Sequence, residues 1–286
     1  MSATIERHVR RVGGICMQYR EAGMANTRAD TPTLVLLHAS PRSSAMFEPW
    51  MQTLSLNWRV LAIDTPGYGG SDPLVTAPTR LADYLPPLRE LLQAVAGPRF
   101  VMYGSATGAQ LGIAYANTHP GDVQHLLLDN AAHFDDAERA HVLSRYFPDL
   151  SPRADGSHLL VAWQMATQMV QYFPWYEDNE AHRVSSRVPS AAEVHAAITE
   201  LISAGPGYAA AYRAAFEHER AEHVLALRVP ATLFRWQASI LLKHIDRLMS
   251  FKLPGLVRCI ETPADPVGRY AVMTAHLLAL RDVTSH

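Results

Sequence analysis

The sequence predicts an α/β fold: a mostly parallel sheet with helices on both faces and a helical insertion. Over residues 31–132, short apolar runs alternate with longer segments of helical periodicity, as in a chain of strand-helix units. Strand-like runs are missing from residues 133–225 and return at 229–261. The 286 residues are enough for one large α/β domain with an inserted subdomain.

The predicted strands begin with a β-hairpin over residues 5–23, which alternates in hydrophobicity and breaks at Gly13-Gly14. Buried parallel strands are expected wherever a short apolar run ends in turn-forming residues. These runs lie within residues 31–40, 58–72, 99–108, 123–132, 229–236 and 255–261. Because parallel strands end at one edge of a sheet, the loops that follow them are expected to gather there.

The predicted helices follow the strands, and Pro86-Pro87 interrupts the first of them. They lie at residues 81–97, 109–120, 241–249 and 269–280, and the clearest helices of the insertion lie at 158–176 and 189–205. An insertion before the last two strands usually covers the crevice at the carboxyl ends of the sheet. The predicted domains are a core of residues 1–132 and 226–286, and a helical cap, or lid, of residues 133–225.

The composition disfavours several classes of partner. The net charge is -2 with no long charged run, which disfavours nucleic acid and membrane surfaces. The 14 histidines form no metal-site spacing, and no cofactor motif is visible, so neither a metal nor a cofactor is expected. The N-terminus lacks the apolar core of a signal peptide, so the cytoplasm is the expected compartment. A small molecule is the expected partner, and the sequence leaves a homodimer open.

Four segments, in the right order, resemble the α/β-hydrolase superfamily. They are the loop LLHASP, the loop DTPGYGGSD, the run GSATGAQLGIAYANTHP and the strand VPATLFRWQAS. The third resembles a nucleophile elbow, a strained turn between a strand and a helix that exposes the catalytic nucleophile. LLHASPRSSAMF together with DGSHLLVAW resembles an unassigned bacterial branch of this superfamily. The resemblance implies a capped α/β-hydrolase fold.

The catalytic triad of that superfamily is degenerate in this sequence. An elbow needs small residues on both sides of its apex, and only the frame from Gly104 to Gly108 supplies them. That frame puts Ala106, which has no nucleophilic atom, at the apex. The segment 237–239, where the acid is expected, holds no carboxylate, and the loop after residues 255–261 holds no histidine. Ordinary serine-hydrolase chemistry is therefore not expected.

Other parts of the site are expected to remain. By the resemblance, the backbone N–H groups of Ser40 and Thr107 form an oxyanion hole, which does not depend on side-chain identity. His38, on the loop after its strand, is the candidate general acid or base, since histidine titrates near neutral pH. The alternative is that His38 only braces its loop. Arg42 could clamp a substrate carboxylate, or could only pin the loop.

The remaining candidates each have a structural alternative as well. Asp129 ends the strand before the insertion and could serve as the catalytic acid, or could cap the following turn. Ser105 flanks the apex, where its hydroxyl could contact a substrate. Trp163, Trp175 and Tyr176 could line an apolar pocket, or could join the insertion to the core.

Three functional hypotheses follow. The first is an enzyme that acts on a small, fairly apolar carbonyl compound by hydrolysis or a lyase-type step, with His38 or a residue of the insertion moving the proton. The second is a catalytically inactive pseudo-hydrolase that binds a small ligand. The third is a serine hydrolase with an engineered Ser-to-Ala change at Ala106.

Overall fold

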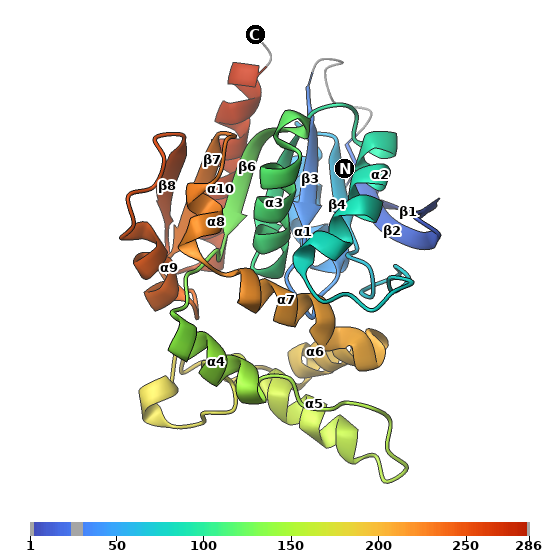
Figure 1. Cartoon of the computed structure of the whole chain (residues 1–286), viewed down its shortest axis with the longest axis vertical. Helices are drawn as coiled ribbons and strands as arrows, with labels where there is room; N and C mark the ends of the chain where they lie inside the picture. The colour runs from blue at the N-terminus through green and yellow to red at the C-terminus, as the bar shows by residue number, and fades with distance from the viewer. Residues whose placement is uncertain (1–2, 24–30, 285–286) are drawn as a thin grey trace.

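The computed structural model describes residues 3–23 and 31–284, and these contain an eight-stranded sheet (Figure 1). The strands are β1 (Glu6–Val12), β2 (Ile15–Ala22), β3 (Thr33–Leu37), β4 (Val60–Ile63), β5 (Phe100–Ser105), β6 (Val123–Asp129), β7 (Ala231–Trp236) and β8 (Val257–Thr262). Their order is β1-β2-β4-β3-β5-β6-β7-β8. The β1–β2 and β2–β4 pairs are antiparallel and the others are parallel, which confirms the mostly parallel sheet. The predicted core also includes residues 1–2, 24–30 and 285–286, which lie outside the described residues.

The strands arise where the sequence pattern places them. Gly13 and Gly14 have φ values of 55° and 83°, which glycine adopts without strain, so the hairpin turns where predicted. β3 and β4 consist of apolar or small residues and are buried along their whole length. Such continuous burial is typical of central strands in a sheet that is covered on both faces.

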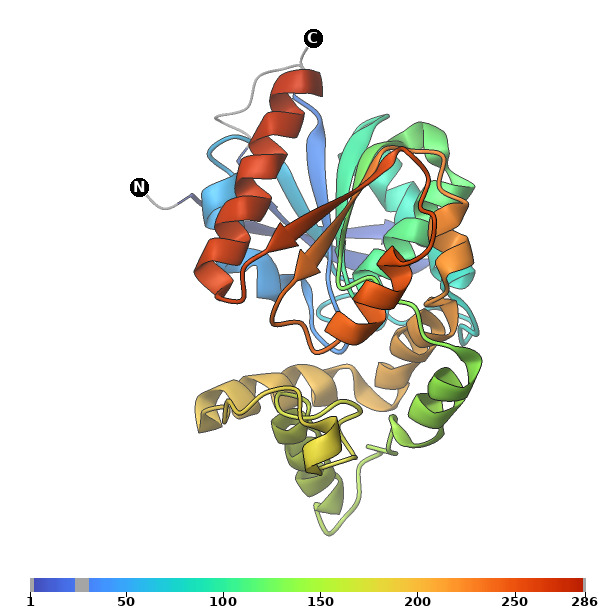
Figure 2. The same ribbon diagram turned by 90° about the vertical axis from the view of Figure 1, so that its left-hand side faces the viewer.

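The helices lie on both faces of the sheet and beyond its carboxyl ends. They are α1 (Glu48–Leu54), α2 (Leu85–Val95), α3 (Thr107–Thr118), α4 (Asp136–Arg145), α5 (Ser157–Gln168), α6 (Ala191–Ser203), α7 (Ala210–His218), α8 (Ala221–Leu225), α9 (Leu242–Met249) and α10 (Pro266–Thr284). α1 and α10 bury their apolar residues on one face, and α2, α3, α8 and α9 on the other (Figure 2). The sheet therefore has a hydrophobic core on each side.

Proline residues affect the limits of two predicted helices in the structure. The first begins as a 3-10 turn, Leu81–Tyr84, and continues as α2 with Pro86 in its opening turn, where a missing N–H costs nothing. The predicted helix at 158–176 ends at Gln168. Pro174 disfavours helical backbone in the residue before it, and Tyr172 instead forms a β-bridge with Arg183.

α4 to α7 lie together beyond the carboxyl ends of the parallel strands, and we call residues 136–218 the helical layer (Figures 1 and 2). This layer comes between β6 and β7 in the sequence, where the strand pattern predicted an insertion. α8 falls within the predicted insertion as well, but it packs against α3 beside the sheet. No helix within the described residues is long and apolar enough to cross a membrane.

Candidate functional site

The turn from β5 into α3 has the backbone of a nucleophile elbow. Ala106 lies at its apex with φ 48° and ψ -109°, a conformation that L-residues rarely adopt. Its N–H donates to the carbonyl of Asp129 (2.9 Å), and its carbonyl accepts from the N–H of Gln110 (3.1 Å). These hydrogen bonds hold the strained turn between β6 and α3.

The two glycines of the elbow are required by its surroundings. A Cβ on Gly104 would overlap the backbone of Gly108, and a Cβ on Gly108 would overlap the carbonyl of Leu37 at the end of β3. The frame from Gly104 to Gly108 therefore fits the turn, and Ala106 occupies the position of the nucleophile. An alanine methyl group cannot form a covalent intermediate.

A cavity of about 360 Å³ lies between the elbow and the helical layer. The loops at the strand ends contribute Ala39, Ser40, Arg42, Met46, Ser105, Ala106, Thr107, Asn130, Trp236, Ile240 and Leu241. The opposite wall consists of Tyr146, Met169, Phe173, Tyr212, Ala215, Phe216 and Glu219. Its size and its mostly apolar walls are typical of a small-molecule site.

The predicted oxyanion hole has free donors. Neither the N–H of Ser40 nor that of Thr107 has a hydrogen-bond partner within the described residues. Thr107 is the first residue of α3, where backbone N–H groups have no partner inside the helix. Because both residues line the cavity, a ligand oxygen could accept hydrogen bonds from them.

His38 does not line this cavity. Its ring is buried between two loops: with the proton on Nδ1, Nδ1 donates to the carbonyl of Ala39 (3.0 Å), and Nε2 accepts from the N–H of Thr65 (3.0 Å). Burial lowers the pKa of the imidazole. His38 therefore joins the loop after β3 to the loop after β4, which is the alternative role that the sequence allowed.

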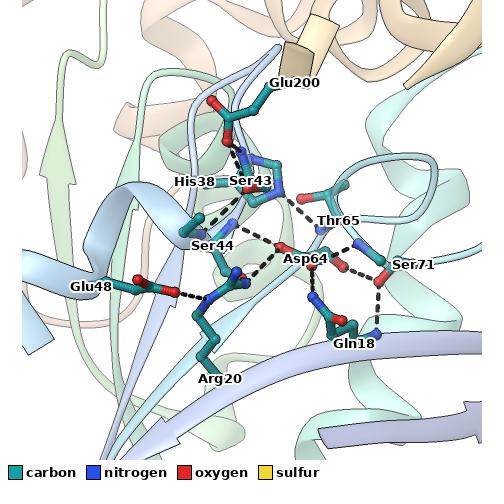
Figure 3. A network of polar contacts seen from close by, with 12 residues as sticks. Gln18, Arg20, His38, Ser43, Ser44, Glu48, Asp64, Thr65, Ser71 and Glu200 are labelled. Atoms are coloured by element: carbon teal, nitrogen blue, oxygen red, sulfur yellow. Dashed lines mark hydrogen bonds and ion pairs between the residues drawn. The ribbon is translucent and has the colours of Figure 1, made fainter. Parts of the chain in front are cut away.

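Asp64 organises the same two loops (Figure 3). Its carboxylate accepts from the N–H groups of Ser44 (2.7 Å) and Gly70 (2.9 Å) and from the amide of Gln18 (2.7 Å). Arg20 lies 3.9 Å away. This network joins the loop that carries Ser40 to β2 and to the loop after β4.

Asp129 is buried next to the elbow and is already paired. It accepts from the hydroxyls of Tyr103 (2.8 Å) and Ser105 (3.4 Å) and forms an ion pair with Arg269. Arg269 comes from the first turns of α10, directly after β8, and its guanidinium lies over the ring of Trp236 (4.1 Å). The segment in which a catalytic histidine was sought thus supplies an arginine. The sequence had allowed Asp129 to cap the following turn, and its side chain does not do so.

Arg42 lines the cavity but is also paired. Its Nε donates to Glu200 of α6, and Glu200 accepts from the hydroxyl (2.7 Å) and the N–H (3.2 Å) of Ser43 as well. One carboxylate of the helical layer therefore holds the loop after β3. A substrate carboxylate would have to displace Glu200 to reach the guanidinium.

The three predicted aromatic residues lie away from the cavity wall. The side chain of Trp163 is 42% exposed on α5. Trp175 is buried and donates to the carbonyl of Tyr146 (2.9 Å), and Tyr176 donates to the carbonyl of His141 (2.8 Å). The hydrogen bonds of Trp175 and Tyr176 join the segment after α5 to the end of α4. Both residues come after α5 ends at Gln168 and are not among the cavity-lining residues.

Most of the cavity wall was missed by sequence reasoning, including Tyr146, Tyr212, Glu219 and Trp236. The hydroxyls of Tyr146 and Tyr212 lie 3.1 Å apart. Glu219 stands in the run HERAEH, whose charges are typical of an exposed helix surface. No histidine is among the lining residues within the described chain, and no three His, Cys, Asp or Glu side chains there are placed to hold a metal ion.

Comparisons with known proteins agree with this fold. The family profile of the alpha/beta hydrolase fold matches residues 32–174, half of the chain. Epoxide hydrolase 3 of Xenopus tropicalis is 35% identical over 107 residues, which cover 36% of this chain and 28% of that protein. A 1-acylglycerol-3-phosphate O-acyltransferase of Arabidopsis thaliana is 32% identical over 113 residues, 38% of this chain and 27% of that protein.

A solved structure extends the likeness to the whole chain. Epoxide Hydrolase A of Mycobacterium thermoresistibile superposes with a TM-score of 0.67 at 18% identity, covering 98% of both chains. At that identity the likeness concerns the fold alone, and the two curated relatives carry out different reactions. The strand order, the elbow and the family match together place this chain in the α/β-hydrolase fold family.

Proposed function

We propose that this chain is an enzyme that binds a small, mainly apolar carbonyl compound beneath the helical layer, which acts as its cap. The substrate oxygen accepts hydrogen bonds from the N–H groups of Ser40 and Thr107. The reaction is a hydrolysis or a lyase-type step that forms no covalent intermediate at position 106. The observation that carries the proposal is the pair of unpartnered N–H groups in the wall of an apolar cavity.

The chemistry of such a site follows from where charge develops. When a carbonyl carbon is attacked, or a neighbouring carbon loses a proton, the oxygen gains negative charge. Donors that are already oriented stabilise this charge without reorganisation, and more strongly in an apolar cavity than in water. The elbow and the loop after β3 supply such donors through their backbone, so Ala106 does not impair them.

A non-catalytic ligand-binding role is the second candidate. It is favoured by Ala106 and by the ion pair of Asp129 with Arg269, which together leave no nucleophile-histidine-acid arrangement among the described residues. The ion pair of Asp129 with Arg269 also disfavours the hypothesis of a serine hydrolase with an engineered alanine. A serine at position 106 would still have no histidine beside it among the cavity-lining residues.

Two small carbonyl probes can test binding and chemistry together. 4-Fluoroacetophenone reports binding by fluorine NMR, and exchange of its methyl protons for deuterium reports enolate formation. 4-Fluorophenyl acetate reports hydrolysis. We expect the ketone to bind and the protein to accelerate at least one of the two reactions. Binding without either reaction would favour the ligand-binding role.

A variant that fills the site supplies the control. Ala106→Leu adds bulk beside the two donors, and we expect it to abolish ketone binding. Ala196→Leu adds the same bulk on the exposed face of α6 and should bind as the wild type does. Thermal unfolding confirms that both variants are folded. Equal binding by both variants would refute a site at the elbow.

A further inference from the structure

Glu219 follows α7 and places a carboxyl group in the wall of the cavity. The residue is 4% exposed, and its Oε2 has no hydrogen-bond partner within the described residues. Buried carboxyl groups are normally hydrogen-bonded or paired, because an unpaired polar atom loses its hydration without replacement. The carboxyl group of this cavity-lining residue therefore has hydrogen-bonding capacity that no group in the described part of the chain satisfies.

The backbone of Glu219 is fixed even though its carboxyl group is free. Its carbonyl accepts from Nη2 of Arg139 (2.9 Å) and from the N–H of Phe134 (3.3 Å). Nε of Arg139 also donates to the carbonyl of Phe216 (3.1 Å). The guanidinium is thus occupied with carbonyl groups and with the carboxylate of Asp136 (2.7 Å), and no ion pair joins it to the Glu219 carboxylate in the described chain. The structure holds the side chain in place without neutralising it.

The surroundings of the carboxyl group suit a base that works near neutral pH. Burial raises the pKa of Glu219 to about 8, and the nearby charge of Arg139 opposes this shift only in part. The other titratable groups near it are the hydroxyls of Tyr146 and Tyr212, which lie 3.1 Å apart and whose own pKa values are raised by burial. A carboxylate with such a pKa is a far stronger base than an exposed one.

We propose that Glu219 is the catalytic base of this site, and that it removes a proton from the carbon next to the carbonyl group of the bound substrate. This inference rests on the proposed function. It adds that the substrate carries hydrogen on that carbon, so that its class is an enolisable ketone, aldehyde or thioester.

The step balances without any further reactant. A carboxylate oxygen of Glu219 takes the proton, and the electron pair of the broken C–H bond forms the C=C bond of the enolate. The π electrons of the carbonyl bond move to its oxygen, which lies at the N–H groups of Ser40 and Thr107. Return of the proton regenerates the carboxylate, and in heavy water it delivers deuterium to the substrate.

The test is exchange of the methyl protons of 4-fluoroacetophenone in heavy water. Wild-type exchange should rise about tenfold per pH unit and level off near pH 8, where Glu219 is ionised. Glu219→Gln keeps the shape but cannot accept the proton, and it should lower the rate at least ~100-fold. Its affinity for the ketone, measured by fluorine NMR, should change less than about threefold. Glu219→Asp should recover part of the rate.

Glu217→Gln is the matched control, because it makes the same change on an exposed position of α7. It should exchange at the wild-type rate. If Glu219→Gln keeps the wild-type rate and pH profile, this proposal is wrong while the proposed function stands. The same holds if the wild type hydrolyses the ester but exchanges no methyl protons. If the wild type does not bind the ketone at all, both proposals fail.

Discussion

Asp64 and Glu219 are both buried acidic residues near the cavity, yet their surroundings differ sharply. Asp64 accepts three hydrogen bonds from two backbone N–H groups and one amide and lies near Arg20 (Figure 3). Glu219 has an oxygen with no partner and faces a cavity. The first carboxyl group is satisfied by donors from two loops and from β2, and the second lines a cavity together with Tyr146, Tyr212 and Phe216.

This difference separates a structural role from a functional one. A carboxylate that accepts hydrogen bonds from several buried donors stabilises the fold, and it has no free acceptor site for a ligand. A carboxyl group that is buried without partners costs stability, and such groups cluster at functional sites. The strand-end loops thus supply the rigid frame, and Glu219, directly after the helical layer, is the proposed reactive group.

Removing Asp64 should have the largest effect on stability. Asp64→Ala leaves the N–H groups of Ser44 and Gly70 and the amide of Gln18 without their acceptor, in the buried region beside Arg20. We expect a loss of about 3 to 5 kcal/mol in the free energy of unfolding, measured with urea at pH 7. Asp72→Ala is the control, because the exposed carboxylate of Asp72 accepts, among the described residues, one hydrogen bond, from the N–H of Cys16 (2.8 Å). Equal losses in the two variants would contradict the structural role of Asp64.

Removing the Glu219 carboxyl group should act in the opposite direction. Its pKa rises from 4.5 in the unfolded chain to about 8 in the fold. Stability from protonated Glu219 is therefore complete below about pH 4.5 and is lost as the pH rises through about 8. The wild type should lose on the order of 3 kcal/mol relative to Glu219→Gln over this range, with about 5 kcal/mol as the upper limit.

Urea unfolding of both proteins at pH 5 and pH 8.5 measures this difference. The Gln variant should gain relative stability as the pH rises, and it should be the more stable protein at pH 8.5. Parallel pH profiles would mean that Glu219 ionises freely in the folded protein.

Glu200 links the two regions, and its removal should have a smaller effect. It is partly exposed and accepts from Arg42 and Ser43, so Glu200→Gln should cost about 0.5 to 1.5 kcal/mol. Hydrogen exchange of α6 amides should accelerate, while that of β3 should not. Arg42→Ala combined with Glu200→Gln should cost little more than Glu200→Gln alone. Fully additive losses would show that the two residues act separately.

Ala106→Ser should have the smallest effect. Asp129, the acid beside the elbow, is occupied by Arg269, and no histidine lines the cavity in the described chain. We expect no covalent adduct when the wild type or this variant is treated with a fluorophosphonate and weighed by intact-mass spectrometry. A stoichiometric adduct on the variant would instead support a serine hydrolase that carries an engineered alanine.

The sequence predicts the frame of the site because that frame depends on local backbone geometry. Gly104 and Gly108 are needed wherever a strand turns this tightly into a helix, and a single sequence shows them. The apolar runs likewise mark β3 to β8 without knowledge of the partner strands. The fold, the apex at Ala106 and the loop that carries Ser40 follow from such signals.

The side chains that line the cavity or lie close to it are placed by contacts between distant segments, and they could not be predicted in this way. The buried backbone of Glu219 is held by Arg139 of α4 and by Phe134, and the run HERAEH gives no sign of these contacts. Trp163 lies in an apolar stretch but faces outward, since helical pattern alone does not say which neighbours a helix will have. Asp129 forms its ion pair with Arg269, which comes 140 positions later in the chain.

The ion pair of Arg42 with Glu200 also bears on how fast a ligand can arrive. Arg42 is half exposed where it lines the cavity, and the adjacent carboxylate balances its charge. The charge of Arg42 is therefore largely cancelled there, and Arg42 does not steer an incoming molecule to the site. Association should proceed at an unsteered rate, on the order of 10⁵ to 10⁷ M⁻¹s⁻¹, and should change little between low and high salt.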